Sequence, residues 1–292
     1  MNSVLKKLLP AALRAFLRDV RAAVLSLGLP SGKTTEQPEN EREASRAMSV
    51  VVAICDAPEL VSRCLGSLER YAPKSEIILV DDGSMLPETR ALIEDFRSRN
   101  GWSVVRHERP KGHSRSCEAG ARLATRPYLC LLNSDTVITP WSWSAAKEAF
   151  ESDQRIGITG PSTSHAPTAQ AIRRAQHCRH YWSDNQIWAF ARQYVSNCPR
   201  RPWLDMSGVS GFAFFVRRSL WEELGGFDLS LPDYGNECEF CQRAGERGWR
   251  IVWTQDSYIH HFGHGSYGRL GEGVIGRLTH AAQAYIDGKY NR

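Results

Sequence analysis

The chain has 292 residues, of which 42% are hydrophobic and 24% are charged, and this composition is typical of a globular protein. The length suits one large domain or two small ones, with a core large enough to be stable without disulfides or structural metals. The chain contains no run of about 18 apolar residues, so we expect no membrane-spanning helix. The formal net charge of +5 is small, and we expect no nucleic-acid partner.

Eight cysteines are scattered along the chain. Cys130 lies within an apolar run, and Cys55 and Cys64 lie in or beside other apolar segments. This distribution is typical of reduced, buried thiols and differs from the regular framework of a disulfide-rich protein. We therefore expect the protein in the cytoplasm.

Residues 1–29 are predicted to form a basic amphipathic helix. Apolar residues recur on one side at helical spacing, namely Leu5, Leu9, Leu13, Phe16, Val20, Val24 and Leu27. Basic residues fall on the opposite side, namely Lys7, Arg14, Arg18 and Arg21. Such a helix either binds an anionic membrane or packs on this protein or on a second copy, and the sequence leaves these alternatives open. Membrane binding would place the protein peripherally at the inner face of the cell membrane.

Residues 30–47 are polar and lack hydrophobic periodicity, so they are predicted to be a linker. From Met48 onward, short apolar runs alternate with helical patterns. Strands are expected at 49–54, 76–80, 102–106 and 128–132, with helices at 58–71, 87–100 and 114–124 between them. This alternation predicts right-handed crossovers and a mainly parallel sheet, and hence an α/β fold.

Carboxylates follow three of the predicted strands. Asp56 follows the first strand, Asp81 and Asp82 end the second, and Asp135 follows the fourth. Ligands of parallel sheets bind beyond the carboxyl ends of the strands, so these side chains are expected to form a site together. A single Asp at such a position is explained as well by a turn or a helix cap. A buried carboxylate is nevertheless costly unless it is paired or binds a metal.

Several motifs resemble the nucleotide-sugar-binding half of family 2 inverting glycosyltransferases with the GT-A fold. They are Val80-Asp81-Asp82-Gly83-Ser84, then Gly112 with Arg115 and Gly120, then Leu132-Asn133-Ser134-Asp135-Thr136. Blocks at 204–212, 217–228, 233–243 and 260–266 resemble later parts of the same family, in family order. The resemblance covers roughly residues 48–268 and is to bacterial enzymes of the rhamnosyltransferase or polysaccharide type.

The resemblance implies a Rossmann-like, mainly parallel central sheet with flanking helices. A nucleotide-sugar-binding half is expected at residues 48–160, and an acceptor-binding half with a C-terminal helix at 161–292. The implied reaction moves a hexosyl or deoxyhexosyl group from a UDP- or dTDP-sugar to a hydroxyl acceptor. The acceptor would be a glycan, a lipid-linked glycan or a protein glycan.

The resemblance also implies a divalent metal, Mn²⁺ or Mg²⁺, which would stabilise the charge on the departing diphosphate. Asp135 matches the metal-binding end of the family's D-x-D motif, and Asn133 replaces its first Asp. His261 is the second implied metal ligand, because it stands five residues before Ser266, as in the family. His260 and His264 are its neighbours, and the alternative is that these histidines are structural.

Glu237 is the implied general base, which would take the proton of the acceptor hydroxyl. Matching Phe240-Cys241-x-Arg243 to the family pattern places Glu237 at the base position and Glu239 at the motif's second acid. Glu239 is therefore the next candidate. The family usually has Asp at the base position, and a capping role at the start of a helix is the alternative for both residues.

The remaining implied site residues contact the nucleotide sugar. The full set of residues implied to bind the nucleotide sugar, which includes Asn133 and Asp135 from the metal motif, is Ala53, Asp56, Asp81, Asp82, Arg115, Asn133, Ser134, Asp135 and Gly211. Asp82 would accept a hydrogen bond from the imide of uracil or thymine, and Arg115 would face the base or the phosphates. Glu118 departs from the family, which commonly has Asn at this position.

Two other functions fit part of the pattern. A nucleotidyltransferase also combines an α/β sheet with metal-binding Asp residues, but it needs a glycine- and lysine-rich signature that residues 53–59 lack. A non-catalytic protein of the same fold that binds carbohydrate or nucleotide sugar would be expected to have lost Asp135 or Glu237, and both are present.

Overall fold

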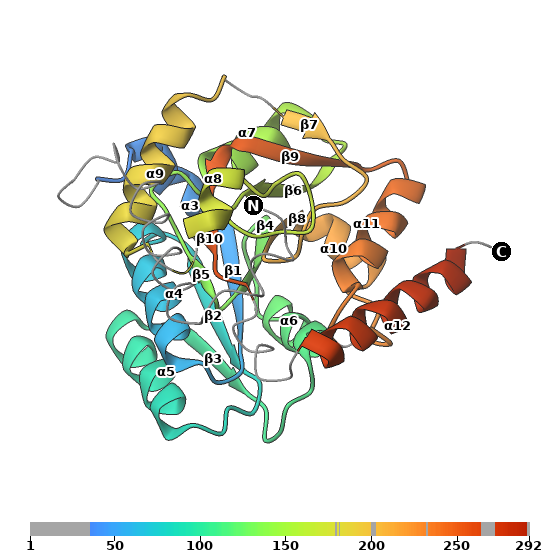
Figure 1. The fold of residues 1–292 in the computed structure, drawn as a ribbon, viewed down its shortest axis with the longest axis horizontal. Helices are drawn as coiled ribbons and strands as arrows, with labels where there is room; N and C mark the ends of the chain where they lie inside the picture. Colours follow the sequence, from blue (N-terminus) through green and yellow to red (C-terminus); the bar gives the residue numbers. More distant parts are fainter. Residues whose placement is uncertain are drawn as a thin grey trace, which may run out of the picture.

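An eight-stranded sheet with the order β3-β2-β1-β4-β8-β6-β9-β7 forms the centre of the molecule (Figure 1). The structure is a computed structural model that describes residues 36–178, 180, 182–199, 203–231, 233–263 and 272–290. The strands are β1 (Met48–Ile54), β2 (Glu76–Asp81), β3 (Ser103–Arg106), β4 (Tyr128–Asn133), β6 (Ile156–Ser162), β7 (Trp203–Asp205), β8 (Ala213–Arg217) and β9 (Arg250–Tyr258). A separate two-stranded sheet pairs β5 (Thr136–Val137) with β10 (His260–His261).

The first half of the large sheet is parallel. β1 pairs in parallel with both β2 and β4, and β2 pairs in parallel with β3. Strand β8 then lies antiparallel between β4 and β6, and β9 runs parallel to β6. The predicted α/β class with a mainly parallel sheet is thus confirmed, and the parallel pairing is concentrated in the half predicted to bind the nucleotide sugar.

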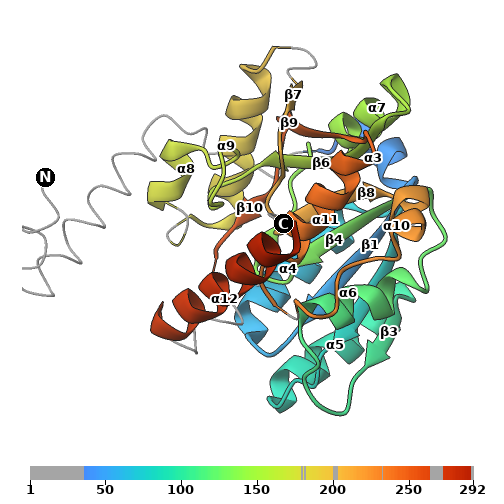
Figure 2. The ribbon, with the colours of Figure 1, turned by 90° about the vertical axis from the view of Figure 1, so that its right-hand side faces the viewer.

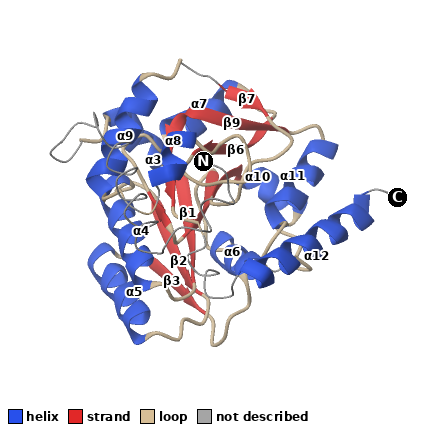
Figure 3. Ribbon diagram, viewed as in Figure 1, coloured by secondary structure: helices blue, strands red, loops and turns tan. Residues whose placement is uncertain are grey.

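Helices cover both faces of this sheet, as Figure 3 shows. Helices α4 (Pro58–Tyr71), α5 (Pro87–Asn100), α7 (Ser144–Ser152), α8 (Arg173–Cys178) and α9 (Asp184–Ser196) contribute to one apolar core. Helices α6 (His113–Ala121), α10 (Arg218–Leu224) and α11 (Asn236–Glu246) contribute to the other. Alternate residues of β1 face the two cores, because successive strand side chains point to opposite faces: Val50 and Val52 face the first core and Val51 the second.

The structure differs from the predicted linker at residues 30–47. Within the described part of that range, α3 (Glu39–Ser45) is a helix that packs beside α7. Glu41 is buried, and its Oε2 accepts hydrogen bonds from the backbone N–H groups of Trp143, at 2.8 Å, and Ser144, at 3.0 Å. A carboxylate at the start of α7 also interacts favourably with that helix's dipole. The domain boundaries at residues 29, 47 and 160 stay predictions.

The last described element is a long helix, α12 (Glu272–Tyr290). Figures 1 and 2 both place it beside α11. Within the described part of the chain, no helix has the length and hydrophobicity needed to span a membrane. The amphipathic helix predicted at residues 1–29 lies outside the described residues.

Candidate active site

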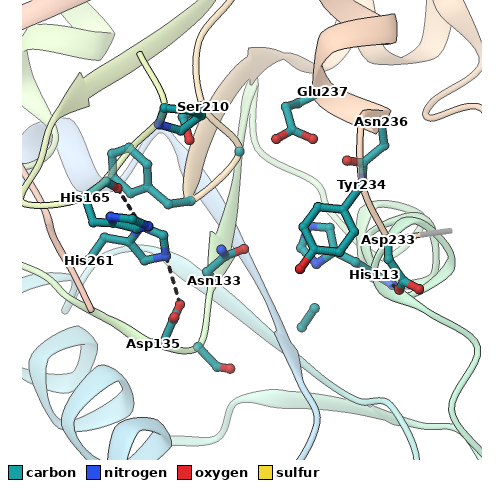
Figure 4. A pocket seen from close by; sticks show the side chains of 15 residues that line it. His113, Asn133, Asp135, His165, Ser210, Asp233, Tyr234, Asn236, Glu237 and His261 are labelled. Carbon is teal, nitrogen blue, oxygen red and sulfur yellow. Dashed lines mark hydrogen bonds and ion pairs between the residues drawn. The ribbon is translucent and has the colours of Figure 1, made fainter. Parts of the chain in front are cut away.

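A pocket of about 240 Å³ opens beyond the carboxyl ends of β1 and β4 (Figure 4). Its walls include predicted site residues from five segments, namely Ala53, Asn133, Ser134, Asp135, Gly211, Glu237 and His261. Its other lining residues are His113, His165, Pro167, Ser210, Phe212, Asp233, Tyr234 and Asn236. Of the four carboxylates predicted to converge at this edge of the sheet, only Asp135 lines the pocket.

Asp135 and His261 face each other at one end of the pocket. Nε2 of His261 lies 3.2 Å from Oδ1 of Asp135, and both residues are largely buried, at 8% and 7% exposure. The small sheet brings them together, because β10 pairs His261 with Thr136, the residue after Asp135. The backbone N–H of Phe262 also donates to the carbonyl of Asp135, at 3.0 Å.

The imidazole of His261 is held in one orientation. Its Nδ1 lies 2.7 Å from the carbonyl oxygen of His165, and because a carbonyl only accepts, Nδ1 must carry the hydrogen. In the neutral ring, Nε2 then presents its lone pair toward Asp135. The ring of Phe212 stacks on the imidazole, with 5.2 Å between ring centroids and 17° between planes. Metal-binding histidines are typically oriented in this way by a carbonyl bonded to the other ring nitrogen.

A divalent cation fits the Asp135–His261 pair by its chemistry. A carboxylate oxygen and an imidazole nitrogen suit Mn²⁺, and carboxylate oxygen also suits Mg²⁺. A site with two protein ligands leaves coordination positions for phosphate oxygens and water, as is usual for Mg²⁺ at nucleotides. In the described residues, no cluster of three or more His, Cys, Asp or Glu side chains could hold a metal.

Glu237 occupies the other side of the pocket, in the first turn of α11. Burial raises the pKa of its carboxyl group above the ordinary range, although hydrogen bonds from its own backbone N–H and from that of Gly211 oppose the rise. A Cβ atom on Gly211 would lie 2.9 Å from both Cδ and Oε1 of Glu237. Gly211 is therefore needed for the close approach of this backbone segment to the carboxylate.

Glu239, the second predicted base, lies outside the pocket. It is fully buried, and its oxygens accept hydrogen bonds from Arg243, Lys289 and Tyr290 at 2.7–2.9 Å. Burial would raise the pKa of Glu239, but the hydrogen bonds from these three residues outweigh it and lower the pKa. Of the two candidates, the structure brings only Glu237 to the pocket.

Asp81 and Asp82, at the end of β2, do not line the pocket. Asp81 accepts hydrogen bonds from Arg106 Nε and from the backbone N–H of Ser84, both at 2.9 Å. Asp82 accepts from the backbone N–H groups of Lys111 and Gly112, at 2.8 and 2.9 Å, and its Oδ1 lies 2.7 Å from His107 Nδ1. Both carboxylates therefore hold nearby loops in place, and their contact with a nucleotide stays a prediction.

Asp56 and Arg115 also lie outside the pocket lining. Oδ1 of Asp56 accepts hydrogen bonds from the backbone N–H groups of Met85 and Leu86, at 2.9 and 2.8 Å. Asp56 is one of two non-glycine residues in the described chain with positive φ, at 56°, which is uncommon and often found near functional sites. Arg115 is exposed on α6. Their roles in nucleotide binding stay predictions.

Eight pocket residues were not predicted, and four of them have titratable side chains: His113, His165, Asp233 and Tyr234. The backbone N–H of His113 donates to Oδ1 of Asp233 at 3.2 Å. Burial lowers the pKa of His113 below its usual range, against the opposing effect of nearby carboxylates. Asp233 and Tyr234 belong to the same block, 233–243, as Glu237, and His113 follows Gly112, so their position in or beside the motifs could have indicated them. His165 had none, because a single histidine after a strand is usually structural.

Glu118, the departure from the family pattern, has a structural partner. Its Oε1 accepts a hydrogen bond from the backbone N–H of Phe227 at 3.1 Å, which ties α6 to the loop after α10. Burial raises the pKa of this carboxyl group.

The pocket thus has two chemically different sides, as Figure 4 shows. Asp135, His261 and His165 lie on one side, and Glu237, Tyr234 and Asp233 on the other, with Asn133 between them. The first side can hold a cation and the phosphates it neutralises. The second side can hold a hydroxyl group and accept its proton.

The model of the family described as "Glycosyl transferase family 2" matches residues 49–225, which is more than half of the chain. The chain therefore belongs to this family.

Curated relatives share this part of the chain. The O-antigen biosynthesis protein RfbC of Myxococcus xanthus is 26% identical over 231 residues, covering 73% of this chain and 17% of that protein. The poly-beta-1,6-N-acetyl-D-glucosamine synthase of Staphylococcus epidermidis is 28% identical over 124 residues, covering 42% of this chain and 30% of that protein. The chain spans less than a third of the length of either relative.

Solved structures of GT-A glycosyltransferases share the fold. The crystal structure of GalNAc-T7 with UDP, GalNAc and Mn²⁺ aligns with a TM-score of 0.59 at 19% identity, covering 87% of this chain and 53% of that one. The mannosyltransferase PcManGT from Pyrobaculum calidifontis, in complex with GDP-Man and Mn²⁺, aligns with a TM-score of 0.52 at 15% identity, covering 85% and 66%. At these identities the likeness shows the fold alone.

Proposed function

We propose that this protein is a metal-dependent, inverting glycosyltransferase. Its donor is a UDP- or dTDP-activated hexose or deoxyhexose, and its acceptor is a hydroxyl group of a glycan, free, lipid-linked or attached to a protein. The observation that carries the proposal is the placement of Glu237 opposite the Asp135–His261 pair in one pocket. Structures of the same fold hold UDP or GDP-mannose together with Mn²⁺, which supports a nucleotide-sugar donor.

The donor's diphosphate is proposed to bind beside Asp135 and His261. These two residues would hold Mn²⁺ or Mg²⁺, which supplies charge stabilisation for the departing diphosphate when it is bound. His165 keeps Nε2 of His261 directed to this position through the bond to Nδ1. Asn133, between the two sides of the pocket, is placed to contact the donor.

Glu237 is proposed to act on the acceptor. The acceptor oxygen forms a bond to the anomeric carbon while the bond from that carbon to the diphosphate oxygen breaks, and the hydroxyl proton passes to the Glu237 carboxylate. A single displacement from the face opposite the leaving group inverts the configuration at this carbon. The raised pKa of Glu237 suits the role, because a carboxylate with higher proton affinity is a stronger base.

The test is a calorimetric titration of the full chain with UDP and with dTDP, in Mn²⁺ and again in excess chelator. We expect binding of one or both nucleotides with Mn²⁺ and a loss of at least about tenfold in affinity with chelator, because metal and diphosphate bind together. Equal affinity under the two conditions would contradict the metal's role. Tighter binding of GDP or ADP would contradict the choice of base.

A further inference from the structure

The segment between α10 and α11 forms one wall of the pocket. We call residues 228–231 and 233–235 the pocket loop; it carries Asp233 and Tyr234 and leads directly into the turn of α11 that presents Glu237. Where this loop lies determines where Tyr234 and Glu237 stand relative to Asp135. The contacts that hold the loop are therefore contacts that hold the site.

Helix α12 contacts both ends of the pocket loop through polar side chains. Nζ of Lys289 lies 2.8 Å from Oδ2 of Asp228, at the start of the loop, and 2.7 Å from Oε1 of Glu239, just after its end. The hydroxyl of Tyr285 also donates to Asp228, at 2.8 Å, and that of Tyr290 donates to Glu239, at 2.7 Å. One helix thus connects the two ends of the loop through a shared ammonium group.

The same helix packs on the last residue of the loop. A Cβ atom on Gly235 would lie 3.0 Å from Cβ of Ala282 and 3.2 Å from Cδ1 of Ile286. Ala282 is buried by this contact, at 7% exposure. The apolar contact and the ion pairs lie on the same side of α12, so the helix has a defined position on the loop.

The charged groups in this contact stabilise one another by pairing. Glu239 is fully buried, and a buried carboxylate is stable only when it is well paired. Arg243 pairs with both of its oxygens and donates to the carbonyls of Leu224 and Gly226, before the loop. For Asp228, burial would raise the pKa, but hydrogen bonds from Lys289, Ser230 and Tyr285 outweigh it and hold the pKa well below its usual range.

We propose that α12 is a positioning element of the active site, in which Lys289, with Tyr285 and Tyr290, fixes both ends of the pocket loop. This inference rests on the proposed glycosyl transfer. It assigns a role to residues 272–290, which lie outside the segment matched by the family model. Lys289 acts through Asp228 and Glu239 and has no contact with the pocket, so it is a positioning residue.

The test replaces Lys289 and measures catalysis and donor binding separately. The variant is Lys289→Met, and the matched control is Arg277→Met, which removes an exposed cation from the same helix. Release of nucleoside diphosphate is measured with UDP-N-acetylglucosamine, UDP-glucose and dTDP-rhamnose offered in turn. UDP affinity in Mn²⁺ is measured by calorimetry.

We expect Lys289→Met to lower kcat by about 10- to 100-fold, the effect of a displacement of roughly 1 Å at a reacting group. UDP affinity should change by less than about twofold, because the proposed position of the diphosphate, beside Asp135 and His261, is on the other side of the pocket. Lys289→Arg should restore most of the activity, since it keeps the charge between Asp228 and Glu239. Tyr290→Phe removes a single hydroxyl and should lower kcat in the same direction without unfolding the protein.

Two outcomes would contradict the role of α12 and leave the proposed function unaffected. One is a kcat of Lys289→Met equal to that of Arg277→Met and of the unmodified chain. The other is an equal loss in both variants, which would show that any change in α12 damages the protein. Failure of the unmodified chain to release nucleoside diphosphate from all three sugars would instead contradict the proposed function.

Discussion

At the scale of single residues, the pocket depends on how two side chains are held. His261 is oriented by the carbonyl of His165 at Nδ1 and by Phe212 against its ring. Glu237 is held by the backbone of Gly211, which approaches so closely that no side chain fits between them. A catalytic site differs from a mere cluster of polar residues because its reacting groups, here the imidazole and the carboxylate, are held in a fixed orientation.

Gly211 gives a direct test of this close approach. Gly211→Ala places a methyl group against the Glu237 carboxylate, so the carboxylate must move, and we expect kcat for nucleoside diphosphate release to fall by about 10- to 100-fold with UDP affinity retained. Gly66→Ala is the matched control, because Gly66 is helical and nothing lies within 4 Å of an added Cβ. Retained turnover in Gly211→Ala would show that the position of Glu237 does not matter to the reaction.

The sequence predicted the pocket residues to which the family resemblance assigns a role and missed the others. Asp135, His261 and Glu237 were found because each occupies a motif position. His165 was missed because its role is played by its backbone carbonyl, and no residue type is needed to provide a carbonyl. The contact of Asp82 with the nucleotide stays a prediction. What the sequence did not indicate is that its oxygens accept hydrogen bonds from the backbone N–H groups of Lys111 and Gly112, 29 and 30 residues further along the chain.

At the scale of helices and strands, the prediction was best where local signals were strong. Helices 58–71 and 87–100 were predicted with the observed bounds, since each begins with proline at its first position. Helix α3 was missed, because seven residues without an apolar stripe give no periodic signal. Its position depends on Glu41, whose contacts at Trp143 and Ser144 are about a hundred residues away in the chain.

The burial of Glu41 makes the stability of the protein depend on pH. Burial raises its pKa to about 7 from an ordinary 4.5, so the folded state binds more protons than the unfolded state between these values. The free energy of unfolding must then decrease as pH rises through this window. Glu41→Gln keeps the size of the side chain and an oxygen that accepts hydrogen bonds, but it does not titrate. The free energy of unfolding of this variant, relative to that of the unmodified chain, should therefore rise by about 2–3 kcal/mol between pH 4.5 and 7.5.

Urea unfolding of both proteins at several pH values measures this difference. Contributions from all other titrating groups are common to the two chains and cancel in the comparison. A stability difference that stays constant from pH 4.5 to 7.5 would show that Glu41 titrates normally and that α3 is less firmly buried than the structure indicates.

At the scale of the whole molecule, the parallel half of the sheet follows from the β-α alternation, but the other half does not. Strand β8 inserts antiparallel between β4 and β6, which are separated from it by many residues in the chain. Such long-range pairing has no local signature. It matters to the site, because the residues before β8, Gly211 and Phe212, are thereby placed beside Asn133, whose N–H donates to the carbonyl of Phe212 at 2.9 Å.

We propose that the two sides of the pocket act on different substrates, Asp135 on the donor and Glu237 on the acceptor. Glu237→Gln keeps the size of the side chain and can still accept the hydrogen bond from Gly211, but it cannot take a proton. It should lower kcat by about 10²- to 10⁴-fold and leave UDP affinity in Mn²⁺ nearly unchanged. Asp135→Asn should weaken metal-dependent UDP binding as well as turnover.

The most direct measurement is therefore the pair of UDP titrations, in Mn²⁺, of Glu237→Gln and Asp135→Asn, set beside their rates of nucleoside diphosphate release. We expect both variants to lose turnover and only Asp135→Asn to lose affinity for UDP. Near-full turnover in Glu237→Gln, or unchanged UDP affinity in Asp135→Asn, would contradict this division of roles between the two sides of the pocket.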